Sequence, residues 1–455
     1  MKFRILSLIL IICSLLLCSC EEPAGTPENK KYPTVNLNVY NWGEYISDEY
    51  DEECGLLDVN AEFEEYFNQN LADSYGFYVK VNYSTYATNE DMFAKLSNSA
   101  VAYDIVIPSD YMIQKMIAND MLLPLDYSII TNYENISDDF KNMYYDPTNT
   151  YSVPYTYGMV GIIYNSEFVN EEDVEDESWN LLWNEKYSGK ILQFNNPRDA
   201  FATAMYKEGL NINSHNYEDW DKALEELKNQ KPILQGYVND EIFNKMKGAS
   251  AWISSYYAGD FLTMAADNND LRFYYPIEGT NYFVDAMCIP TTSRNPKIAN
   301  EYINFMISLE AATANALYIG YASPNKAVTS NENYQELLDY NYSIYDDEDN
   351  CLVDAWEVLY GKTKDEANDN YSFNPAYEDY FKDEDNGIDV QTHVTALWES
   401  LKTENSTELW IHITSISIVV GVLGFAIYSS YIKKKRSKFY RDRDRELKRQ
   451  RQMNK

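Results

Sequence analysis

Short apolar segments alternate along this chain with segments of helical periodicity, and this alternation limits the fold more than any other feature. Leu37 and Val39 lie on one face of a first predicted strand. Further strands are expected over 77–83, 103–108, 159–165 and 190–194, and helices over 59–74, 90–97, 201–207, 220–228 and 297–308. Asn89 is the expected N-cap of the second helix. Strands and helices in alternation predict an α/β fold.

Polar and aromatic residues directly follow two of these strands. Trp42, Glu44 and Tyr45 come after the first strand, where Asn41 and Gly43 break its pattern. In open α/β sheets, ligands bind beyond the carboxyl ends of the strands. Rings and a carboxylate at that edge suit an organic cation, because ring faces and negative charge both attract it. The alternative is a core Trp and Tyr beside a solvated Glu.

The chain is strongly acidic. It carries 37 Lys and Arg against 72 Asp and Glu in 455 residues, which gives a formal net charge of −35. A field of this sign repels nucleic acid and concentrates cations. A solvated acidic surface is the plainer explanation of the same charge.

Three of the six cysteines lie outside the N-terminal apolar segment, and the chain has three histidines. Cys54, Cys288 and Cys351 form no Cys-x-x-Cys pair, which argues against a zinc or redox site, and we expect no metal and no cofactor. In an exported protein, Cys54 and Cys351 could form a disulfide.

The N-terminal segment is typical of an export signal. Residues 5–17 are apolar but too short to span a bilayer comfortably. Leu17-Cys18-Ser19-Cys20 resembles a lipobox, in which Cys20 would be acylated and become the mature N-terminus. We therefore assign residues 1–19 to a lipoprotein-type signal peptide and 20–34 to a polar tether.

The C-terminal segment predicts a membrane span. Residues 409–432 are apolar and contain no Asp, Glu, Lys or Arg. The basic residues of 433–455 follow, so the positive-inside rule leaves this tail in the cytoplasm and the body of the chain outside. A buried core helix is the weaker alternative, because such a helix rarely ends in a basic block.

The motifs of the body resemble those of the spermidine/putrescine-binding proteins of bacterial ABC importers. They are Asn41-Trp42-x-Glu44-Tyr45, Tyr83-Ser-Thr-Tyr86 with Asn89-Glu90, Tyr103-Asp104-Ile-Val-x-Pro108-Ser109-x-Tyr111, Ser152-Val-Pro-Tyr155, Pro197-Arg198-Asp199, Phe283-Val-Asp285 and Ile319-Gly320-Tyr321-x-x-Pro324-Asn325. The resemblance covers about residues 35–401 and depends on the joint order of these motifs.

That resemblance implies a two-lobe, periplasmic-binding-protein-like α/β fold with a ligand cleft, followed here by the C-terminal transmembrane helix. Lobe one would comprise 35–155 with 283–328, and lobe two 156–282 with 329–404. The connecting strands would cross near 153–158 and 283–290. The acidic, Tyr-rich stretch 342–386 is expected to be an addition to the family's C-terminal region.

The resemblance also implies roles for the site residues. Trp42 and Tyr45 would be ring walls, and Glu44 would accept from a terminal ammonium group. Asp285 would pair with another nitrogen beside Phe283. The other expected ligand-binding residues are Ser109, Tyr111, Asn196, Asp199, Tyr256 and Tyr321. An ammonium group leaves water at a cost of several kcal/mol unless it is paired, which is why such a site needs acids.

This chain departs from the family pattern at several of those positions. Asn196 stands where the family commonly has an acid, and Tyr256 and Phe283 stand where it commonly has indoles. Because one carboxylate is missing, we expect a slight preference for putrescine over spermidine.

The expected function is capture of a polyamine outside the cytoplasm and its delivery to membrane permease subunits driven by a cytoplasmic ATPase. No Ser/His/Asp arrangement, metal cluster or Gly-x-x-x-x-Gly-Lys loop points to an enzyme. A membrane-anchored polyamine sensor and a binding protein for another small organic cation stay open as alternatives.

Overall fold

A mixed β-sheet with helices packed around it forms the body of this computed structural model, which describes residues 31–98, 102–361 and 390–403. Nine strands form the sheet in the order β2-β1-β3-β9-β4-β7-β5-β6, with β8 also paired to β4. The strands are β1 (Thr34–Trp42), β2 (Tyr78–Tyr86), β3 (Ile105–Val106), β4 (Ser152–Asn165), β5 (Ile191–Phe194), β6 (Leu234–Val238), β7 (Ile253–Tyr257), β8 (Leu271–Tyr274) and β9 (Tyr282–Cys288), and β10 (Ile344–Tyr345) pairs separately with β11 (Cys351–Val353).

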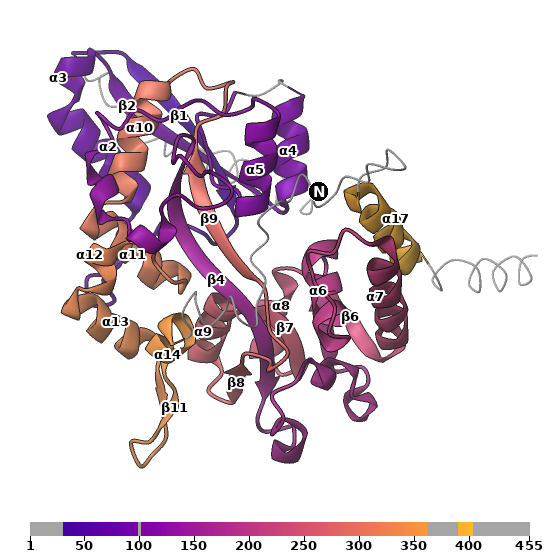
Figure 1. Ribbon diagram of the computed structural model, residues 1–455. Coiled ribbons are helices and arrows are strands. Elements are labelled where there is room, and N and C mark those ends of the chain that lie inside the picture. The colour runs from indigo at the N-terminus through magenta and orange to yellow at the C-terminus, as the bar shows by residue number, and fades with distance from the viewer. Residues whose placement is uncertain (1–30, 99–101, 362–389, 404–455) are drawn as a thin grey trace, which may run out of the picture.

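Helices lie on both sides of this sheet (Figure 1). The α-helices are α2 (Val59–Asn70), α3 (Ala72–Tyr75), α4 (Asn89–Ser97), α5 (Asp110–Ala118), α6 (Pro197–Lys207), α7 (Tyr217–Gln230), α8 (Glu241–Lys247), α9 (Ala258–Asp267), α10 (Pro296–Met306), α11 (Leu309–Ile319), α12 (Lys326–Thr329), α13 (Glu332–Tyr342), α14 (Ala355–Tyr360) and α17 (Val390–Thr403). Short 3-10 helices are η1 (Thr131–Asn135), η2 (Asp138–Phe140), η3 (Glu171–Asp173), η4 (Trp179–Trp183), η5 (Glu185–Tyr187) and η6 (Lys231–Ile233). The α/β class predicted from the alternation is confirmed.

Strand β4 joins the two ends of the sheet. Its residues 152–159 pair with antiparallel β9, and its residues 160–165 pair with β7 and β8. Strands β1, β2 and β3 run parallel to one another, as do β5, β6 and β7. In Figure 1, β4 and β9 run through the centre, between the β1–β2 group above and the β7–β8 group below.

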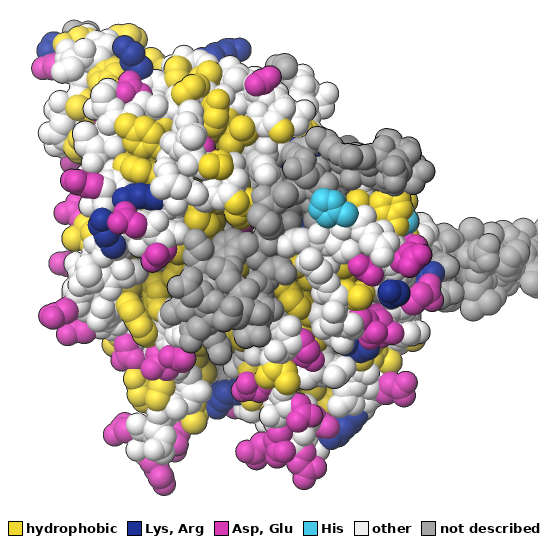
Figure 2. All heavy atoms as spheres, in the orientation of Figure 1, with side chains coloured by type: hydrophobic (Ala, Val, Ile, Leu, Met, Phe, Trp, Pro, Cys, Tyr) yellow, Lys and Arg dark blue, Asp and Glu magenta, His cyan; other side chains and the backbone are white. Residues whose placement is uncertain are grey.

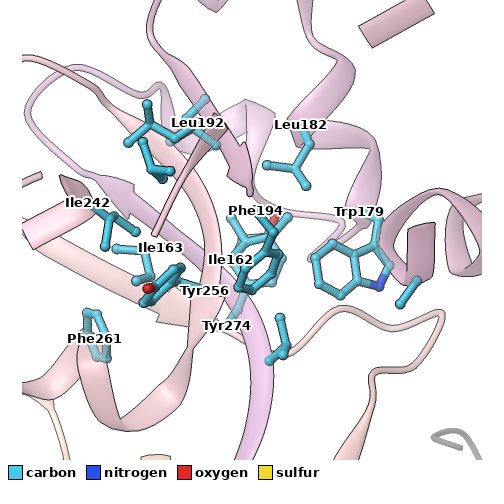
Figure 3. Packing of buried hydrophobic residues seen from close by; sticks show 14 of the residues in the cluster. Ile162, Ile163, Trp179, Leu182, Leu192, Phe194, Ile242, Tyr256, Phe261 and Tyr274 are labelled. Carbon is cyan, nitrogen blue, oxygen red and sulfur yellow. The ribbon is translucent and has the colours of Figure 1, made fainter. Parts of the chain in front are cut away.

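Two hydrophobic cores lie on the two sides of this crossing. The first core gathers buried residues of 37–159 and 282–321, and the second core gathers those of 160–274 and 316–401. Figure 3 shows the second core, where Tyr256 lies among aliphatic side chains such as Ile163 and Ile242. Strands β4 and β5 are buried along most of their length, which fits their largely apolar sequences, whereas the edge strand β2 alternates between buried and more exposed residues.

Several predicted boundaries are corrected by the structure. The helix expected over 59–74 is broken at Leu71 into α2 and α3 and ends at Gly76, whose φ of 76° is left-handed. Thr88, not Asn89, is the N-cap of α4, because its hydroxyl accepts from Asp91 N–H. The strand expected over 103–108 shortens to β3, since Asp104 Oδ2, rather than a strand carbonyl, accepts from Asn38 N–H at 2.9 Å.

The described part of the predicted C-terminal addition packs on the second core. Tyr360 at the end of α14 contacts the Tyr334 hydroxyl at 2.8 Å and accepts from Ser323 N–H. Helix α17 lies beside α7 (Figure 1). The His393 ring of α17 stacks on Tyr217 at 4.4 Å. Cys54, Cys288 and Cys351 are free thiols, so the structure contains no Cys54–Cys351 disulfide.

The predicted signal peptide with Cys20, most of the tether, the span at 409–432, the basic tail and residues 362–386 of the addition lie outside the described residues. None of the helices within 31–98, 102–361 and 390–403 is long and apolar enough to cross a membrane. On the face shown in Figure 2, Asp and Glu side chains are more abundant than Lys and Arg, as the net charge predicts.

Candidate functional site

A cavity of about 220 Å³ lies between the two cores, lined by residues that follow the carboxyl ends of β1, β3, β5 and β6. This is the edge at which α/β sheets bind ligands. All eleven residues predicted to bind the ligand line it: Trp42, Glu44, Tyr45, Ser109, Tyr111, Asn196, Asp199, Tyr256, Phe283, Asp285 and Tyr321. The structure therefore brings the predicted set together, while the role of each residue stays a prediction.

Trp42 and Tyr45 form the part of the wall that follows β1. The Trp42 indole donates from Nε1 to the Ile107 carbonyl at 3.0 Å and packs on the Tyr86 ring at 4.6 Å. Tyr45 is 7% exposed, and its hydroxyl donates to Asp285 Oδ2 at 2.6 Å. Burial and the nearby Asp285 raise the pKa of Tyr45 well above its ordinary value, so this hydroxyl keeps its proton.

Asp285 is the most deeply buried of the predicted acids. It is 4% exposed, on β9, where it pairs with Thr156 of β4 and bridges to Ser109. Burial raises the pKa of its carboxyl from 3.8 to about 6, and the Ser109 and Tyr45 hydroxyls oppose that rise. Oδ1 accepts no hydrogen bond from any described residue. Asp285 therefore presents a desolvated oxygen that a cationic donor would satisfy.

Glu44 lies at the mouth of the same cavity and is exposed to solvent. Its backbone has a φ of 49°, in the left-handed region that few non-glycine residues adopt. This conformation turns the chain between Trp42, in the wall, and buried Tyr45. Glu44, which the family resemblance assigns to a terminal ammonium group, is thus a residue of the cavity rim.

Asn196 and Asp199 begin α6 on the opposite wall. Asn196 is the N-cap, and its Oδ1 accepts from Asp199 N–H at 2.9 Å. Pro197 follows it at the first helical position. Asp199 Oδ2 accepts from Asn196 Nδ2 and the Tyr257 hydroxyl, both at 2.6 Å, and Oδ1 accepts from Asn281 Nδ2 at 2.9 Å. Three neutral donors therefore hold this carboxylate in place.

Aromatic rings close the cavity. Tyr256 stacks on Phe194 at 5.2 Å in the second core, and Phe283 meets Tyr257 edge-on at 5.4 Å. The Tyr321 ring meets the Tyr45 ring edge-on, with 5.4 Å between ring centres and 80° between planes, so rings from distant segments of the chain meet here. Such faces can lie along methylene groups and attract cations, at roughly 0.5–2 kcal/mol for each contact.

Ser109 and Tyr111 depend on Asn89, which the sequence assigned to a helix cap. Asn89 Oδ1 accepts from Ser109 N–H at 3.3 Å, and its Nδ2 donates to the Tyr111 hydroxyl at 2.9 Å. Tyr111 donates in turn to Glu90 at 3.2 Å. Asn89 is thus buried against the site and fixes the turn after β3.

Asp110, Asp240 and Asp260 also line the cavity and were not singled out from the sequence, and the pKa of two of them is strongly raised. Asp110 is 3% exposed and accepts from Tyr111 N–H at 2.6 Å and Val284 N–H at 3.2 Å. Asp260, in the first turn of α9, accepts from the Tyr321 hydroxyl at 3.0 Å. Burial raises the pKa of the Asp110 and Asp260 carboxyls to about 7. The available signal was an acid inside an otherwise apolar stretch, as at Asp260.

The lining as a whole is negatively charged. Carboxylates come from seven of the described lining residues, Glu44, Glu90, Asp110, Asp199, Asp240, Asp260 and Asp285, and Arg198 alone among them is positive. The Arg198 guanidinium lies 5.6 Å from the Tyr111 ring centre and lowers the pKa of Asp110 against the effect of burial. Acids and rings around one cavity suit an organic cation of extended shape.

A metal is a poorer occupant on the described residues. Within 31–98, 102–361 and 390–403, no group of three His, Cys, Asp or Glu side chains is arranged to hold a metal ion. The carboxylates of the cavity are instead separated by rings and neutral donors.

Comparison with known proteins places this chain in a family. The family described as "Bacterial extracellular solute-binding protein" matches residues 61–340. The spermidine/putrescine-binding periplasmic protein of Salmonella typhimurium is 29% identical over 347 residues, which cover 76% of this chain and 90% of that protein. The protein of the same name from Escherichia coli is 32% identical over 292 residues, which cover 64% of this chain and 78% of that protein.

Solved structures agree with this assignment. A putative spermidine/putrescine ABC transporter protein from Listeria monocytogenes has a TM-score of 0.59 and 28% identity, over 81% of this chain and 99% of that one. The spermidine/putrescine ABC transporter substrate-binding protein of Streptococcus pneumoniae, solved with calcium and HEPES, has a TM-score of 0.53 and 30% identity, over 80% and 99%. The resemblance seen in the motifs is confirmed: the chain belongs to the family of bacterial extracellular solute-binding proteins, and its relatives there include spermidine/putrescine-binding proteins.

Proposed function

We propose that this protein captures a polyamine, putrescine or spermidine, outside the cytoplasm and delivers it to the permease of an ABC importer. The observation that carries the proposal is the buried Asp285 carboxylate, whose Oδ1 lacks a donor among the described residues and which lines a cavity walled by rings. Relatives named as spermidine/putrescine-binding proteins support the same ligand class. The protein acts in this proposal as a binding protein and not as an enzyme.

Binding would depend on both sides of the cavity. Residues 35–155 with 283–328 would form one lobe and 156–282 with 329–404 the other, around the first and second cores respectively. A ligand that contacts both lobes favours the state in which they lie together. Trp42 and Phe283 would cover the methylene groups, and Asp285 would pair with an ammonium group.

The membrane anchors belong to the same proposal. Acylation of Cys20 and a span over residues 409–432 would both hold the protein at the membrane, with the basic tail in the cytoplasm. An anchored binding protein stays close to its permease, which raises the effective concentration of loaded protein there.

Titration calorimetry of the purified full-length chain with putrescine, spermidine and spermine tests the ligand class. We expect micromolar or tighter binding to at least one of the three, which corresponds to about 8 kcal/mol or more. Asp267→Asn, which removes an exposed acid that pairs with Lys247, is the matched control and should bind like the wild type. Absence of heat with all three amines would refute the proposal.

A further inference from the structure

A short segment after α11 links the cavity to the first core. This crossing segment (residues 321–325) begins at Tyr321, whose ring lines the cavity. It ends at Asn325, where Nδ2 donates to the carbonyl of Ile307, a buried residue of the first core, at 2.9 Å. The position of the crossing segment is therefore tied to the first core and to one wall of the cavity.

Helix α14 holds the crossing segment from the side of the second core. The Tyr360 hydroxyl accepts from Ser323 N–H at 3.0 Å and contacts the Tyr334 hydroxyl at 2.8 Å. Tyr334 of α13 and Leu359 of α14 are buried in the second core, and both helices contact α9. One hydroxyl thus connects the second core to a segment that the first core anchors.

This connection lies at the strand crossing and outside the cavity. Tyr157 of β4 lies beside it: its N–H donates to the Ala322 carbonyl at 3.1 Å, and its ring centre is 6.4 Å from that of Tyr360. Neither Ser323 nor Tyr360 is among the described residues that line the cavity. In the view of Figure 1, α13 and α14 lie to the left of β4, whereas α6 and α7 lie to its right. The two cores therefore make this contact without the residues predicted to bind the ligand.

The two walls of the cavity lie close together in the arrangement that makes this contact. The Arg198 guanidinium of α6 is 5.6 Å from the ring centre of Tyr111 on α5. A Cβ on Gly43, which follows β1, would lie 3.8 Å from Oδ2 of Asp240, which precedes α8. The hydrogen bond to Tyr360 is thus a feature of the state in which the two lobes lie together.

We propose that the Tyr360 hydroxyl is a ligand-independent latch, which favours the state with the two lobes together and thereby raises the apparent affinity for the ligand. This inference rests on the proposed function, and it gives a role to α14, which lies beyond the residues 61–340 that match the family. A ligand that needs the lobes together binds more weakly when the free protein populates that state less. Because Tyr360 lies outside the cavity, it is a positioning residue.

The test compares Tyr360→Phe with Tyr274→Phe in the full-length protein. Both changes remove a tyrosine hydroxyl that bonds to the backbone of another segment, but the bond from Tyr274 to the Ser178 carbonyl, at 3.0 Å, stays within lobe two. Tyr360→Phe should weaken the binding of each polyamine that the wild type binds by about threefold to tenfold, as the loss of one hydrogen bond predicts. In titration calorimetry, Tyr274→Phe should bind like the wild type.

Amide hydrogen exchange without ligand tests the latch separately from binding. The first turns of α5 and α6 (110–113 and 197–200) belong to the two walls of the cavity, so their amide groups become more accessible when the lobes separate. Exchange in both turns should be faster in Tyr360→Phe than in the wild type and in Tyr274→Phe.

The two measurements separate the possible outcomes. A purely structural role of Tyr360 would speed exchange around residues 323 and 360 alone, and this result would refute the latch. An affinity of Tyr360→Phe that is unchanged or higher would also refute it. A wild type that binds none of the polyamines would refute the proposed function, and the exchange in the two turns would still decide whether Tyr360 holds the lobes together.

Discussion

Two buried aspartates, one in the turn before β4 and one in the cavity, show how differently the same side chain is used. Asp146 is 3% exposed and accepts from the N–H groups of Thr150, Tyr151 and Ser152 and from the Ser152 hydroxyl, at 2.8–3.0 Å. Asp285 is 4% exposed, receives the Tyr45 hydroxyl on Oδ2, and has no described donor on Oδ1.

The difference separates a structural acid from the acid that pairs with the ligand in the proposed function. Four donors, three of them from the backbone, stabilise the charge of Asp146 and fix the turn. Asp285 is desolvated without full compensation, so its charge destabilises the protein until a cation arrives. Burial alone therefore does not identify a binding acid, whereas burial with an unsatisfied oxygen in a cavity does.

Exchange of each aspartate for asparagine should separate the two roles most strongly. Asp285→Asn removes the charge that pairs with an ammonium group, so polyamine affinity should fall by about 3 kcal/mol, or more than a hundredfold. The melting temperature without ligand should not fall, because the amide oxygen can still accept from Tyr45. Calorimetry and thermal unfolding of the same preparations measure both effects.

Asp146→Asn is the matched control and should show the reverse pattern. Its amide group would point an N–H at backbone donors, which leaves a buried donor unsatisfied and costs about 2–3 kcal/mol of stability. Polyamine affinity should remain at the wild-type value. The distinction fails if both variants lose affinity equally, or if Asp285→Asn unfolds as readily as Asp146→Asn.

Acid pH should weaken binding through Asp285. Its pKa is raised from 3.8 to about 6, so the folded protein holds this proton more tightly than the unfolded chain does. The group therefore adds stability below about pH 3.8, and this contribution is lost as the pH rises through about 6. The affinity for the ligand changes with pH in the opposite direction and rises with pH, because only the ionised carboxylate pairs with an ammonium group.

We expect affinity at pH 5 to be at least about tenfold weaker than at pH 7.5, since alkyl amines with a pKa of about 10.4 stay charged throughout. Titration calorimetry at the two pH values measures the change, and the release of protons on binding at pH 6 provides an independent check. The affinity of Asp285→Asn should depend less on pH than that of the wild type. A wild-type affinity that does not depend on pH would mean that Asp285 is ionised before the ligand binds.

The comparison also shows what the sequence can predict. The order of the motifs was sufficient to predict that Trp42, Asp285 and Tyr321 line one cavity. Each of these residues lies on a strand or turn whose place in the fold the family resemblance implies. The α/β class followed from the alternation of elements. The prediction that Asn89 is the N-cap of α4 was wrong, and Thr88 is the N-cap. The Asn89 side chain instead forms hydrogen bonds with Ser109 and Tyr111, which local sequence does not reveal.

What could not be predicted depends on contacts between distant segments. Nothing local to Asp199 reveals that Asn281, 82 positions away, donates to its carboxylate. Likewise, the pairing of Asp260 with Tyr321 joins residues 61 positions apart and depends on the missing side chain at Gly259. Residue types along the chain give the kind of site, and only the packing shows which acids retain free acceptor positions.

Removal of the Trp42 ring should have an intermediate effect on binding. Trp42→Ala deletes one cation–π surface, so affinity should fall by about 0.5–2 kcal/mol, or roughly threefold to thirtyfold. Trp42→Phe keeps a ring face but loses the bond from Nε1 to the Ile107 carbonyl, as Trp42→Ala also does. If the ring face matters, Trp42→Phe should recover most of the affinity, and equal losses in the two variants would assign the effect to the lost hydrogen bond.

Asp199→Asn should have the smallest effect, although Asp199 lines the cavity and occupies a position that the family resemblance assigns to the ligand. Its carboxylate resembles that of Asp146, since three neutral donors already satisfy it. The asparagine keeps one carbonyl oxygen for these donors, and the Tyr257 hydroxyl can rotate to accept from the new amide. We therefore expect a loss of less than about threefold in calorimetry with spermidine. A tenfold loss would show that Asp199 gives up one of its donors to reach the ammonium group.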